Sequence, residues 1–355
     1  MKVLALHLPQ YHVIPENNEW WGNGFTDWVN VKKAKPLFKG HEQPLIPYKH
    51  NYYDMTNVDT IKIQAETANK FGVYGFIYYH YWFNGKKLLE KPCEILLKNQ
   101  EIKINYCFCW ANETWARTWD GKEKEILIKQ TFGGIEDWKS HIKYLINFFK
   151  DERYIKINNR PIMFFYSCNR IDNFNNMIEY WNEELKKYGF NNLLVVEFVN
   201  SFNSGKHNIN SDIITEFEPL NTARYSVSNI CKLKRFICKK IGIIDFLSYD
   251  YIWKCLLNNK KSYGNKKIFR SAFVNFDNSS RKGKKSLIMK GGNPYKFKNY
   301  LNKLVKANNR NYDDTFLIIN AWNEWAEGAV LEPSDNYGYK YLEAVKSVVE
   351  NANRL

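Results

Sequence analysis

Residues 315–327 read TFLIINAWNEWAE, and this segment decides how the rest of the chain is interpreted. Its first seven residues, Thr315–Ala321, form an apolar run that predicts a buried β-strand. The next six, Trp322–Glu327, combine two tryptophans, an asparagine and two glutamates with one alanine. A buried strand followed directly by charged and aromatic side chains is typical of a strand that delivers residues to a functional site.

Seven more β-rich apolar runs precede this one, and helical segments separate most of them. The predicted strands are Val3–Leu8, Tyr74–Tyr79, Ile104–Trp110, Pro161–Tyr166, Leu193–Val199, Asp212–Phe217 and Ser271–Phe276. The predicted helices cover about 59–71, 135–149, 175–188, 294–307 and 339–351. The chain therefore alternates strands and helices from end to end.

Strands that are apolar throughout are buried on both faces, as in a parallel sheet covered by helices. Eight such units with a closing helix predict an α/β fold, a single (β/α)8 TIM barrel over residues 1–355. The rival is an open doubly wound sheet, which would carry a glycine-rich phosphate turn after an early strand. No G-x-G-x-x-G or Walker A pattern occurs. This argues against the open sheet, a nucleotide cofactor and the Rossmann-like glycosyltransferase design.

In a TIM barrel the active site lies at the carboxyl ends of the strands, so the residues just after each run are candidates for substrate binding. Seven of the eight ends supply an amide, a charge or an imidazole, often beside an aromatic ring. The candidates at these ends are Gln10, Tyr11, His12, Tyr79, His80, Trp82, Trp110, Asn112, Glu113, Arg117, Trp119, Glu216, Asp277, Trp322 and Asn323.

Glu324 and Glu327 are the candidate catalytic residues. Glycosidic bond chemistry needs two carboxyl groups, one as acid and one as base or nucleophile. If the chain turns helical after strand eight, residues three apart share one face. Two close carboxyl groups in an aromatic pocket do not ionise equally easily, so their pKa values are expected to separate. An isolated E-x-x-E is usually a solvated helix face, but two tryptophans and a buried strand favour a site.

Composition agrees with a carbohydrate ligand and predicts no metal and no cofactor. Aromatic residues make up 17% of the chain, and many stand beside polar residues. Tryptophan and tyrosine offer flat faces with a polar edge, which suit a sugar ring. His7 lies inside a strand and is read as a core histidine. No H-x-H or H-E-x-x-H pattern indicates a metal, and the seven cysteines include no C-x-x-C pair.

The net charge of +15 is concentrated in one stretch. Residues 231–285 contain 15 Lys and Arg against 3 Asp and Glu. A basic helical insertion is expected at about 222–267, before strand seven, since this segment is too long for an ordinary βα loop. It could contact a membrane surface or hold a lipid-linked substrate; the alternative is a solvated helical insert packed on the barrel. It contains no nucleic-acid-binding motif.

No run of eighteen apolar residues occurs, and the apolar run after Lys2 is too short for a signal-peptide core. We therefore expect a cytoplasmic protein, with peripheral contact at the inner membrane as an option through the basic insertion.

Five motifs in order give the sequence a family resemblance. They are LPQYH (8–12) with WWG (20–22), GFTDW (24–28), YYHYWF (78–83), WANE (110–113) and WNEWAEG (322–328). They resemble the WbsX-like proteins, glycoside hydrolase family 99-like proteins often encoded with bacterial O-antigen or capsule genes. The resemblance covers about residues 3–345 and implies a TIM barrel.

Family 99 itself comprises endo-α-mannosidases and endo-α-mannanases. The resemblance implies that Glu324 is the base that takes the proton from the sugar 2-hydroxyl, and that Glu327 is the acid that protonates the leaving oxygen. Configuration would be retained through a 1,2-anhydro sugar. Ala326 stands where those hydrolases tend to have histidine. The resemblance also implies stacking on Trp20, Trp21, Trp82, Trp110 and Trp119.

The leading hypothesis is a retaining endo-glycosidase or transglycosylase that acts on a bacterial surface polysaccharide or its precursor. The expected partner is an oligo- or polysaccharide, with an anionic or lipid-linked form as an option, and not nucleic acid. A glycosyltransferase of O-antigen or capsule assembly is the second hypothesis. A non-catalytic glycan-binding protein is the third.

Overall fold

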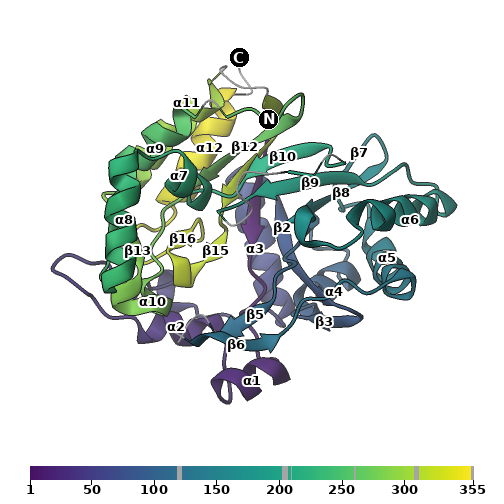
Figure 1. Cartoon of the computed structure of the whole chain (residues 1–355), viewed down its shortest axis with the longest axis horizontal. Coiled ribbons are helices and arrows are strands. Elements are labelled where there is room, and N and C mark those ends of the chain that lie inside the picture. Colours follow the sequence, from purple (N-terminus) through teal and green to yellow (C-terminus); the bar gives the residue numbers. More distant parts are fainter. Residues whose placement is uncertain (118–121, 202–206, 209, 260, 308–311, 353–355) are drawn as a thin grey trace.

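The computed structural model describes residues 1–117, 122–201, 207–208, 210–259, 261–307 and 312–352. Eight parallel strands in this part of the chain form a closed barrel with helices around it (Figure 1). The strands are β1 (Lys2–His7), β2 (Val73–Phe83), β4 (Asn105–Trp110), β8 (Arg160–Phe165), β9 (Leu194–Val199), β10 (Ile213–Glu216), β12 (Lys267–Phe273) and β14 (Tyr312–Asn320). Each pairs with the next, and β1 pairs with both β14 and β2. This closure confirms the predicted TIM barrel.

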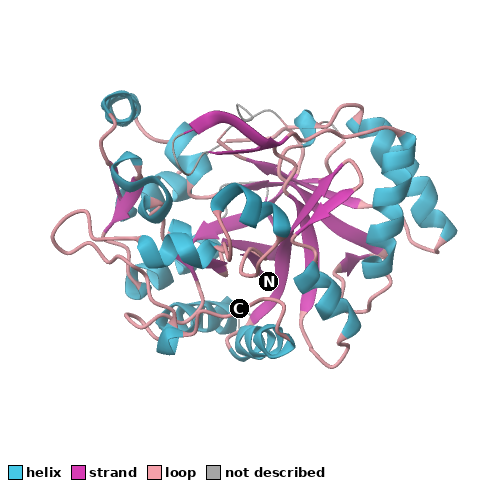
Figure 2. Ribbon diagram, turned by 90° about the horizontal axis from the view of Figure 1, so that it is seen from below, coloured by secondary structure: helices cyan, strands magenta, loops and turns pink. Residues whose placement is uncertain are grey.

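The predicted helices lie on the outside of the barrel, as the side view shows (Figure 2). They are α3 (Val58–Lys70), α5 (Ile135–Phe149), α6 (Phe174–Lys187), α11 (Pro294–Val305) and α12 (Lys340–Ala352); α4 (Lys91–Lys98) is a further helix that was not predicted. In α5 the buried residues Trp138, Ile142, Leu145 and Phe149 recur every three or four positions and so form one apolar face. Among the described residues no helix is long and apolar enough to cross a bilayer.

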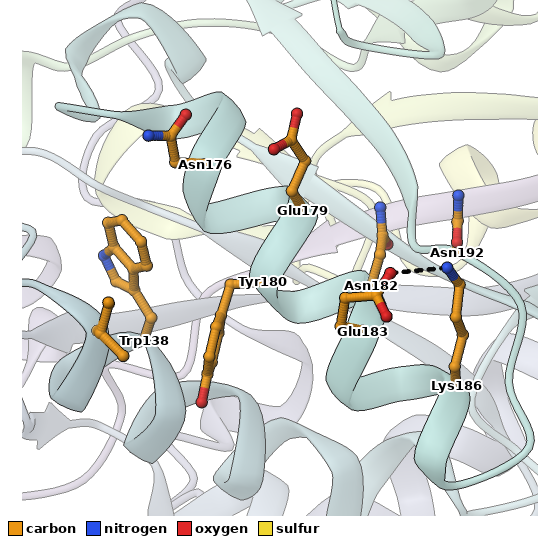
Figure 3. Close-up of a pocket in the computed structure, with 9 residues that line it drawn as sticks. Trp138, Asn176, Glu179, Tyr180, Asn182, Glu183, Lys186 and Asn192 are labelled. Atoms are coloured by element: carbon orange, nitrogen blue, oxygen red, sulfur yellow. Dashed lines mark hydrogen bonds and ion pairs between the residues drawn. The ribbon is translucent and has the colours of Figure 1, made fainter.

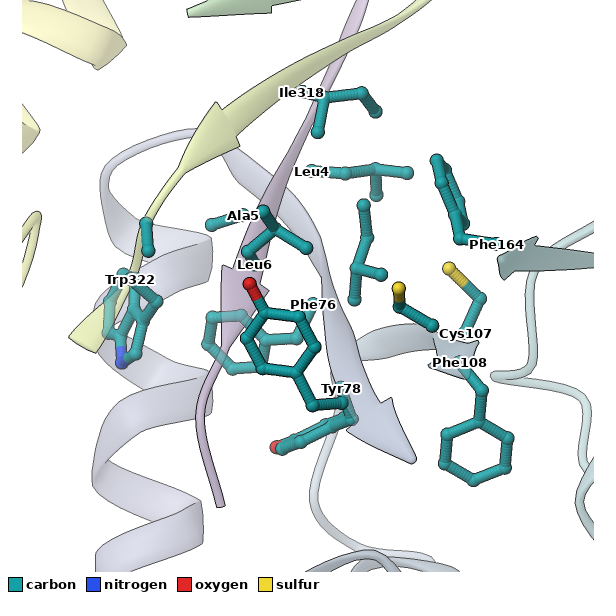
Figure 4. Close-up of a cluster of buried hydrophobic side chains, with 14 of the residues drawn as sticks. Leu4, Ala5, Leu6, Phe76, Tyr78, Cys107, Phe108, Phe164, Ile318 and Trp322 are labelled. Atoms are coloured by element: carbon teal, nitrogen blue, oxygen red, sulfur yellow. The ribbon is translucent and has the colours of Figure 1, made fainter. Parts of the chain in front are cut away.

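Aromatic and aliphatic side chains fill the inside of the barrel and the layer between strands and helices (Figure 4). Phe164 of β8 lies 6.5 Å, between ring centroids, from Phe269 of β12. These strands are not neighbours in the sheet, so the contact crosses the barrel interior. Outside the barrel, Phe76 of β2 packs 4.9 Å from Trp322, which places Trp322 beneath the candidate site.

The basic insertion between β10 and β12 contains α7 (Leu220–Tyr225), α8 (Asn229–Ile241), β11 (Asp245–Ser248) and α9 (Tyr249–Leu257). It is therefore not purely helical. β11 pairs in parallel with β13 (Leu287–Lys290), which follows β12 along the chain. β11 was not predicted, because it has only four residues and its pairing partner lies far along the chain.

Gly75 lets β2 and β4 approach each other closely. A Cβ atom at this position would lie 2.4 Å from the carbonyl oxygen of Asn105, a backbone atom that cannot move away cheaply. We predict that Gly75→Ala lowers the free energy of unfolding by about 1–3 kcal/mol, as measured by urea denaturation. Gly134→Ala is the control, since a Cβ there meets no atom within 4 Å. Equal stability of the two variants would contradict this account of Gly75.

Candidate active site

The segment after β14 forms a tight hairpin at the carboxyl end of the barrel. β15 (Asn323–Glu324) pairs antiparallel with β16 (Ala329–Val330), and the 3-10 helix η4 (Trp325–Glu327) joins them. Gly328 closes the turn with a φ of 64°, in the left-handed region that glycine tolerates. Glu324 and Glu327 thus come together through a 3-10 turn, whereas the sequence suggested one face of an α-helix.

Arg281 links the two glutamates. It lies in α10 (Ser279–Lys282), the short helix that follows β12. Its Nη1 atom lies 2.7 Å from Oε1 of Glu327, and its Nη2 atom lies 3.7 Å from Oε2 of Glu324. The same Nη2 atom lies 3.1 Å from both carboxylate oxygens of Asp27, which begins α2 (Asp27–Lys33). One guanidinium therefore serves three carboxyl groups.

Glu324 is buried, and its Oε2 atom has no hydrogen-bond partner among the described residues. Burial raises the pKa of Glu324 well above its usual value, and the negative charges of Glu327 and Asp27 raise it further. The charge of Arg281 lowers the same pKa in part. A buried carboxyl oxygen with unused hydrogen-bonding capacity is costly for stability, which indicates a functional role.

Three tyrosines surround the carboxyl groups. Burial raises the pKa of Tyr79 and Tyr81 well above the usual value, and the next contribution for both is the charge of Glu324. Tyr166, at the end of β8, has its pKa raised by burial and then by the charges of Glu113 and Glu327. The three side chains therefore lie close enough to the glutamates to sense their charge.

A family model described as Glycosyltransferase WbsX matches residues 3–345. The chain belongs to the WbsX family. It is 30% identical over 354 residues to the uncharacterized protein WxcX of Xanthomonas campestris pv. campestris strain B100, and equally to WxcX of strain ATCC 33913. Each match covers 99% of this chain but 50% of the relative. The chain thus spans about half the length of the curated relatives it matches.

Two solved structures have a fold similar to that of this WbsX-family barrel. A glycoside hydrolase-like protein has a TM-score of 0.61 at 13% identity, covering 98% of this chain and 93% of its own. A GH99 endo-α-mannosidase from Bacteroides thetaiotaomicron, in complex with bis-tris propane, has a TM-score of 0.58 at 11% identity, covering 99% and 97%. At such low identity these likenesses show a shared fold.

The structure does not bring all the predicted site residues of the WbsX chain to the glutamates. His80, Trp82 and Trp110 lie on the outer side of their strands, against α5 and α6. Nε2 of His80 lies 2.8 Å from Nε2 of His141, and the ring of Trp82 stacks on His141 at 4.3 Å. Trp110 is buried and stacks on Trp181 of α6. Burial lowers the pKa of His80 to about 3.

The alternation of side chains along a strand explains this placement. Tyr79 and Tyr81 point toward Glu324, so His80 and Trp82 point to the opposite face. The predicted strand ended at Tyr79, so His80 and Trp82 were expected beyond it, but β2 continues to Phe83. Tyr81 was therefore not among the candidates. It lies two residues after Tyr79 in the same strand, so alternation along the strand would have placed both side chains on one face.

Asn323 and Tyr11 brace the hairpin against β1. The Asn323 side chain accepts a hydrogen bond from the Leu8 N–H at 2.8 Å and donates one to the Leu8 carbonyl at 3.0 Å. The Tyr11 hydroxyl donates to the Asn323 carbonyl and accepts from the Trp325 N–H at 3.3 Å. Both residues are buried and use their polar atoms within the protein.

Glu332 is a buried residue of the site that the sequence analysis missed. Its Oε1 atom accepts hydrogen bonds from Trp322 Nε1 at 2.9 Å and from Gln64 at 2.7 Å. Its Oε2 atom accepts from Trp325 Nε1 at 2.8 Å and from Tyr53 at 2.7 Å. Glu332 thereby fixes both tryptophans that flank the catalytic candidates. No local pattern distinguishes it from an ordinary surface glutamate.

Three further candidates connect loops. Asp277 accepts hydrogen bonds from His41 at 2.7 Å and Gln43 at 3.0 Å, and its N–H donates to the Glu327 carbonyl at 2.7 Å. Glu216 accepts from Asn259 and Tyr263. Asn112 joins the ends of β4 and β8 through two hydrogen bonds with the Ser167 backbone. All three are buried, so they position the loops around the glutamates.

The remaining candidates lie in the segments that follow β1 and β4, which include helix α1 (Pro15–Trp21) and strand β5 (Trp115–Arg117). Trp20 and Trp21 are partly exposed, and the Arg117 guanidinium lies 5.3 Å from the Trp21 ring centroid. Glu113 forms an ion pair with Arg170 at 2.8 Å, and burial raises the pKa of Glu113. Gln10 and His12 are buried, and Nδ1 of His12 lies 3.0 Å from the Pro9 carbonyl. Trp119 lies outside the described residues.

The described part of the chain also has a hollow that lies apart from these carboxyl groups. A hollow of about 690 Å³ lies between α5 and α6 and is lined by Trp138, Tyr180 and Glu183 with their neighbours (Figure 3). None of its lining residues is a predicted site residue. Among the described residues, no group of three or more His, Cys, Asp and Glu side chains could hold a metal ion.

Glu332 makes stability depend on pH in a way that can be measured. Burial raises its pKa from 4.5 to about 7 in the folded protein, although its four donors favour the charged form. The folded state therefore holds the proton over a range in which the unfolded state has lost it, and stability falls as pH rises through that range. We predict that the stability advantage of the wild type over Glu332→Gln narrows as pH rises from 4.5 to about 7.

Urea denaturation across this pH range tests the prediction. In Glu332→Gln the NH₂ group of the amide replaces one oxygen and puts a donor against an indole N–H donor. The variant should therefore be less stable than the wild type by about 1–3 kcal/mol at low pH. Glu343→Gln, on the outer helix α12, is the control. A wild-type advantage over Glu332→Gln that stays constant with pH would show that Glu332 does not titrate in this range.

Proposed function

We propose that this WbsX-family protein is a retaining endo-glycosidase or transglycosylase that acts on a bacterial surface polysaccharide or its precursor. The observation that supports it is the pair Glu324 and Glu327, held by one guanidinium at the carboxyl end of a TIM barrel. Two carboxyl groups are what glycosidic bond cleavage requires. The Oε2 atom of Glu324 accepts no hydrogen bond from the described residues and lies 3.7 Å from Arg281, so it has hydrogen-bonding capacity left for a substrate hydroxyl.

In the proposed first step Glu324 removes the proton from the 2-hydroxyl of the sugar. The resulting oxygen attacks the anomeric carbon and forms a 1,2-anhydro sugar, while Glu327 gives its proton to the departing glycosidic oxygen. In the second step Glu327 takes a proton from water or from a sugar hydroxyl, which opens the three-membered ring, and Glu324 returns its proton to the 2-oxygen. Two inversions give overall retention of configuration.

The raised pKa of Glu324 suits the role of base. A carboxylate whose conjugate acid has a higher pKa is a stronger base, and transfer from a hydroxyl is more efficient when that pKa approaches the working pH. The positive charge of Arg281 acts in the opposite direction and limits this rise in the pKa of Glu324. The tyrosines Tyr79, Tyr81 and Tyr166 supply hydroxyl groups and apolar faces for the sugar beside the reacting bond.

The family description favours a second candidate, a glycosyltransferase of O-antigen or capsule assembly. It would use a nucleotide-linked or lipid-phosphate-linked sugar donor. Incubation with the polysaccharide of the same gene cluster separates the two: shortening of the polymer supports hydrolysis, and growth with an added donor supports transfer. Binding without any turnover would support the third hypothesis, a glycan-binding protein. A cytoplasmic location and an anionic or lipid-linked glycan are parts of the same proposal.

We predict that Glu324→Gln and Glu327→Gln each reduce turnover of the true glycan by about a hundredfold to ten-thousandfold, because each removes one partner in proton transfer. The measurement is product size over time by gel filtration. Glu179→Gln, on the outer surface of α6, is the matched control and should keep full activity. Full activity of either catalytic variant would overturn the proposed mechanism.

Arg281 provides a test based on pH. Replacing it with glutamine removes the positive charge that lowers the pKa of Glu324, so this pKa should rise further. The base must be ionised, and the acidic limb of kcat/KM against pH should therefore move to higher pH. Arg281→Lys retains a charge and should move the limb less. An unchanged limb in Arg281→Gln would show that Glu324 is not the group that limits activity at low pH.

A further inference from the structure

Helix α8 presents an apolar stripe to solvent. Ile230, Leu233, Phe236, Ile237 and Ile241 are between 47% and 83% exposed. With 3.6 residues per turn these positions fall on one side of the helix. Together with Ile243, which follows the helix and is 49% exposed, they are six of the fifteen large apolar side chains that are exposed in the described chain. We call these six residues the α8 stripe.

The opposite side of α8 is fixed to the protein. Only Cys231, Arg235 and Cys238 of this helix are not exposed, and they recur every three or four residues on the inner face. Arg235 forms an ion pair with Asp245 of β11 at 2.7 Å and donates a hydrogen bond to the Ala223 carbonyl. Ser228 caps the first turn by accepting from the Cys231 N–H. The stripe is therefore displayed by an anchored helix.

The charge of α8 indicates what covers the stripe. The helix has five basic residues and no acidic residue. Besides Arg235, they are Lys232, Lys234, Lys239 and Lys240, all exposed. A second copy of α8 would meet the first with the same positive charge and no acid to neutralise it. An anionic surface with an apolar interior matches both features, as in amphipathic helices that lie in a membrane interface.

We propose that α8 docks this protein on an anionic lipid bilayer. The helix lies parallel to the membrane, and the α8 stripe enters the boundary between headgroups and acyl chains. Lys232 and Lys239 beside the stripe contact lipid phosphates, as does Lys240 within it. The outer position of α8 at the edge of the molecule leaves it free to approach a flat surface (Figure 1). This proposal goes beyond the glycosidase and does not depend on it.

Contacts connect the docking helix to the candidate active site. Lys234 donates a hydrogen bond to the carbonyl of Phe246 in β11, and the Phe246 ring packs on Phe38 at 5.1 Å. Phe38 stacks on His41, the residue that binds Asp277 beside Glu327. Changes at α8 can therefore reach the loop that holds Asp277 beside Glu327.

The test is sedimentation of the full chain with lipid vesicles. We expect binding to phosphatidylcholine vesicles with about 30% phosphatidylglycerol, and at least about tenfold weaker binding to phosphatidylcholine alone. Binding to the anionic vesicles should weaken as salt rises from about 0.1 M to about 1 M. Combining Leu233→Ser, Phe236→Ser and Ile237→Ser should reduce that binding at least about tenfold.

The matched control combines Ile63→Ser, Ile135→Ser and Tyr295→Ser, three side chains that are 56%, 59% and 75% exposed elsewhere. It should bind vesicles as the wild type does, and circular dichroism should show that both triple variants are folded. Failure of the wild type to bind anionic vesicles overturns the proposal. So does equal binding by the α8 variant, or a wild-type dimer that the α8 variant dissociates while neither binds vesicles.

Discussion

The charge of Arg281 is the constraint on which the candidate site depends. Asp27, Glu324 and Glu327 come from two distant segments and would repel one another in a buried region. Arg281 is itself only 10% exposed and contacts all three. A guanidinium keeps its charge when it is buried, and its five N–H donors lie in a fixed plane that can reach several acceptors. A lysine ammonium lacks this planar arrangement of donors. The positions of α2, α10 and the hairpin are thus linked by one electrostatic contact.

The barrel could be predicted because almost every strand and outer helix carries its own apolar pattern in the sequence. Each strand, from Val3–Leu8 to Thr315–Ala321, is apolar on both faces, and each outer helix has its own apolar face. These local signals agree with one another, and a parallel sheet covered by helices buries them all. The strand β11 was not predicted, because it depends on pairing with β13 across a whole barrel unit and carries little signal of its own.

The catalytic candidates could be proposed from the sequence, but their surroundings could be proposed only in part. Most strands were located well. Whether a side chain near a strand end points into the barrel or toward the outer helices, however, depends on where the strand stops. β2 runs through His80 and Trp82, so these residues pack against α5 while Tyr81 turns toward Glu324. Arg281 and Tyr166 follow strands β12 and β8, yet neither was among the candidates. Nor was Glu332, since only the fold brings four donors to it.

The hairpin after β14 is mostly scaffold. Trp322, Asn323 and Trp325 commit their polar atoms to Glu332, Leu8 and Tyr11, and Ala326 is fully buried. Ala326, at the position where the resemblance implies a histidine in the family 99 hydrolases, is therefore buried within the turn. In the proposed reaction a sugar would meet two carboxyl groups from this motif and would take its other contacts from β2, from the end of β8 and from the loops. Under that proposal, a change of sugar preference would come from those other elements while the two glutamates stay in place.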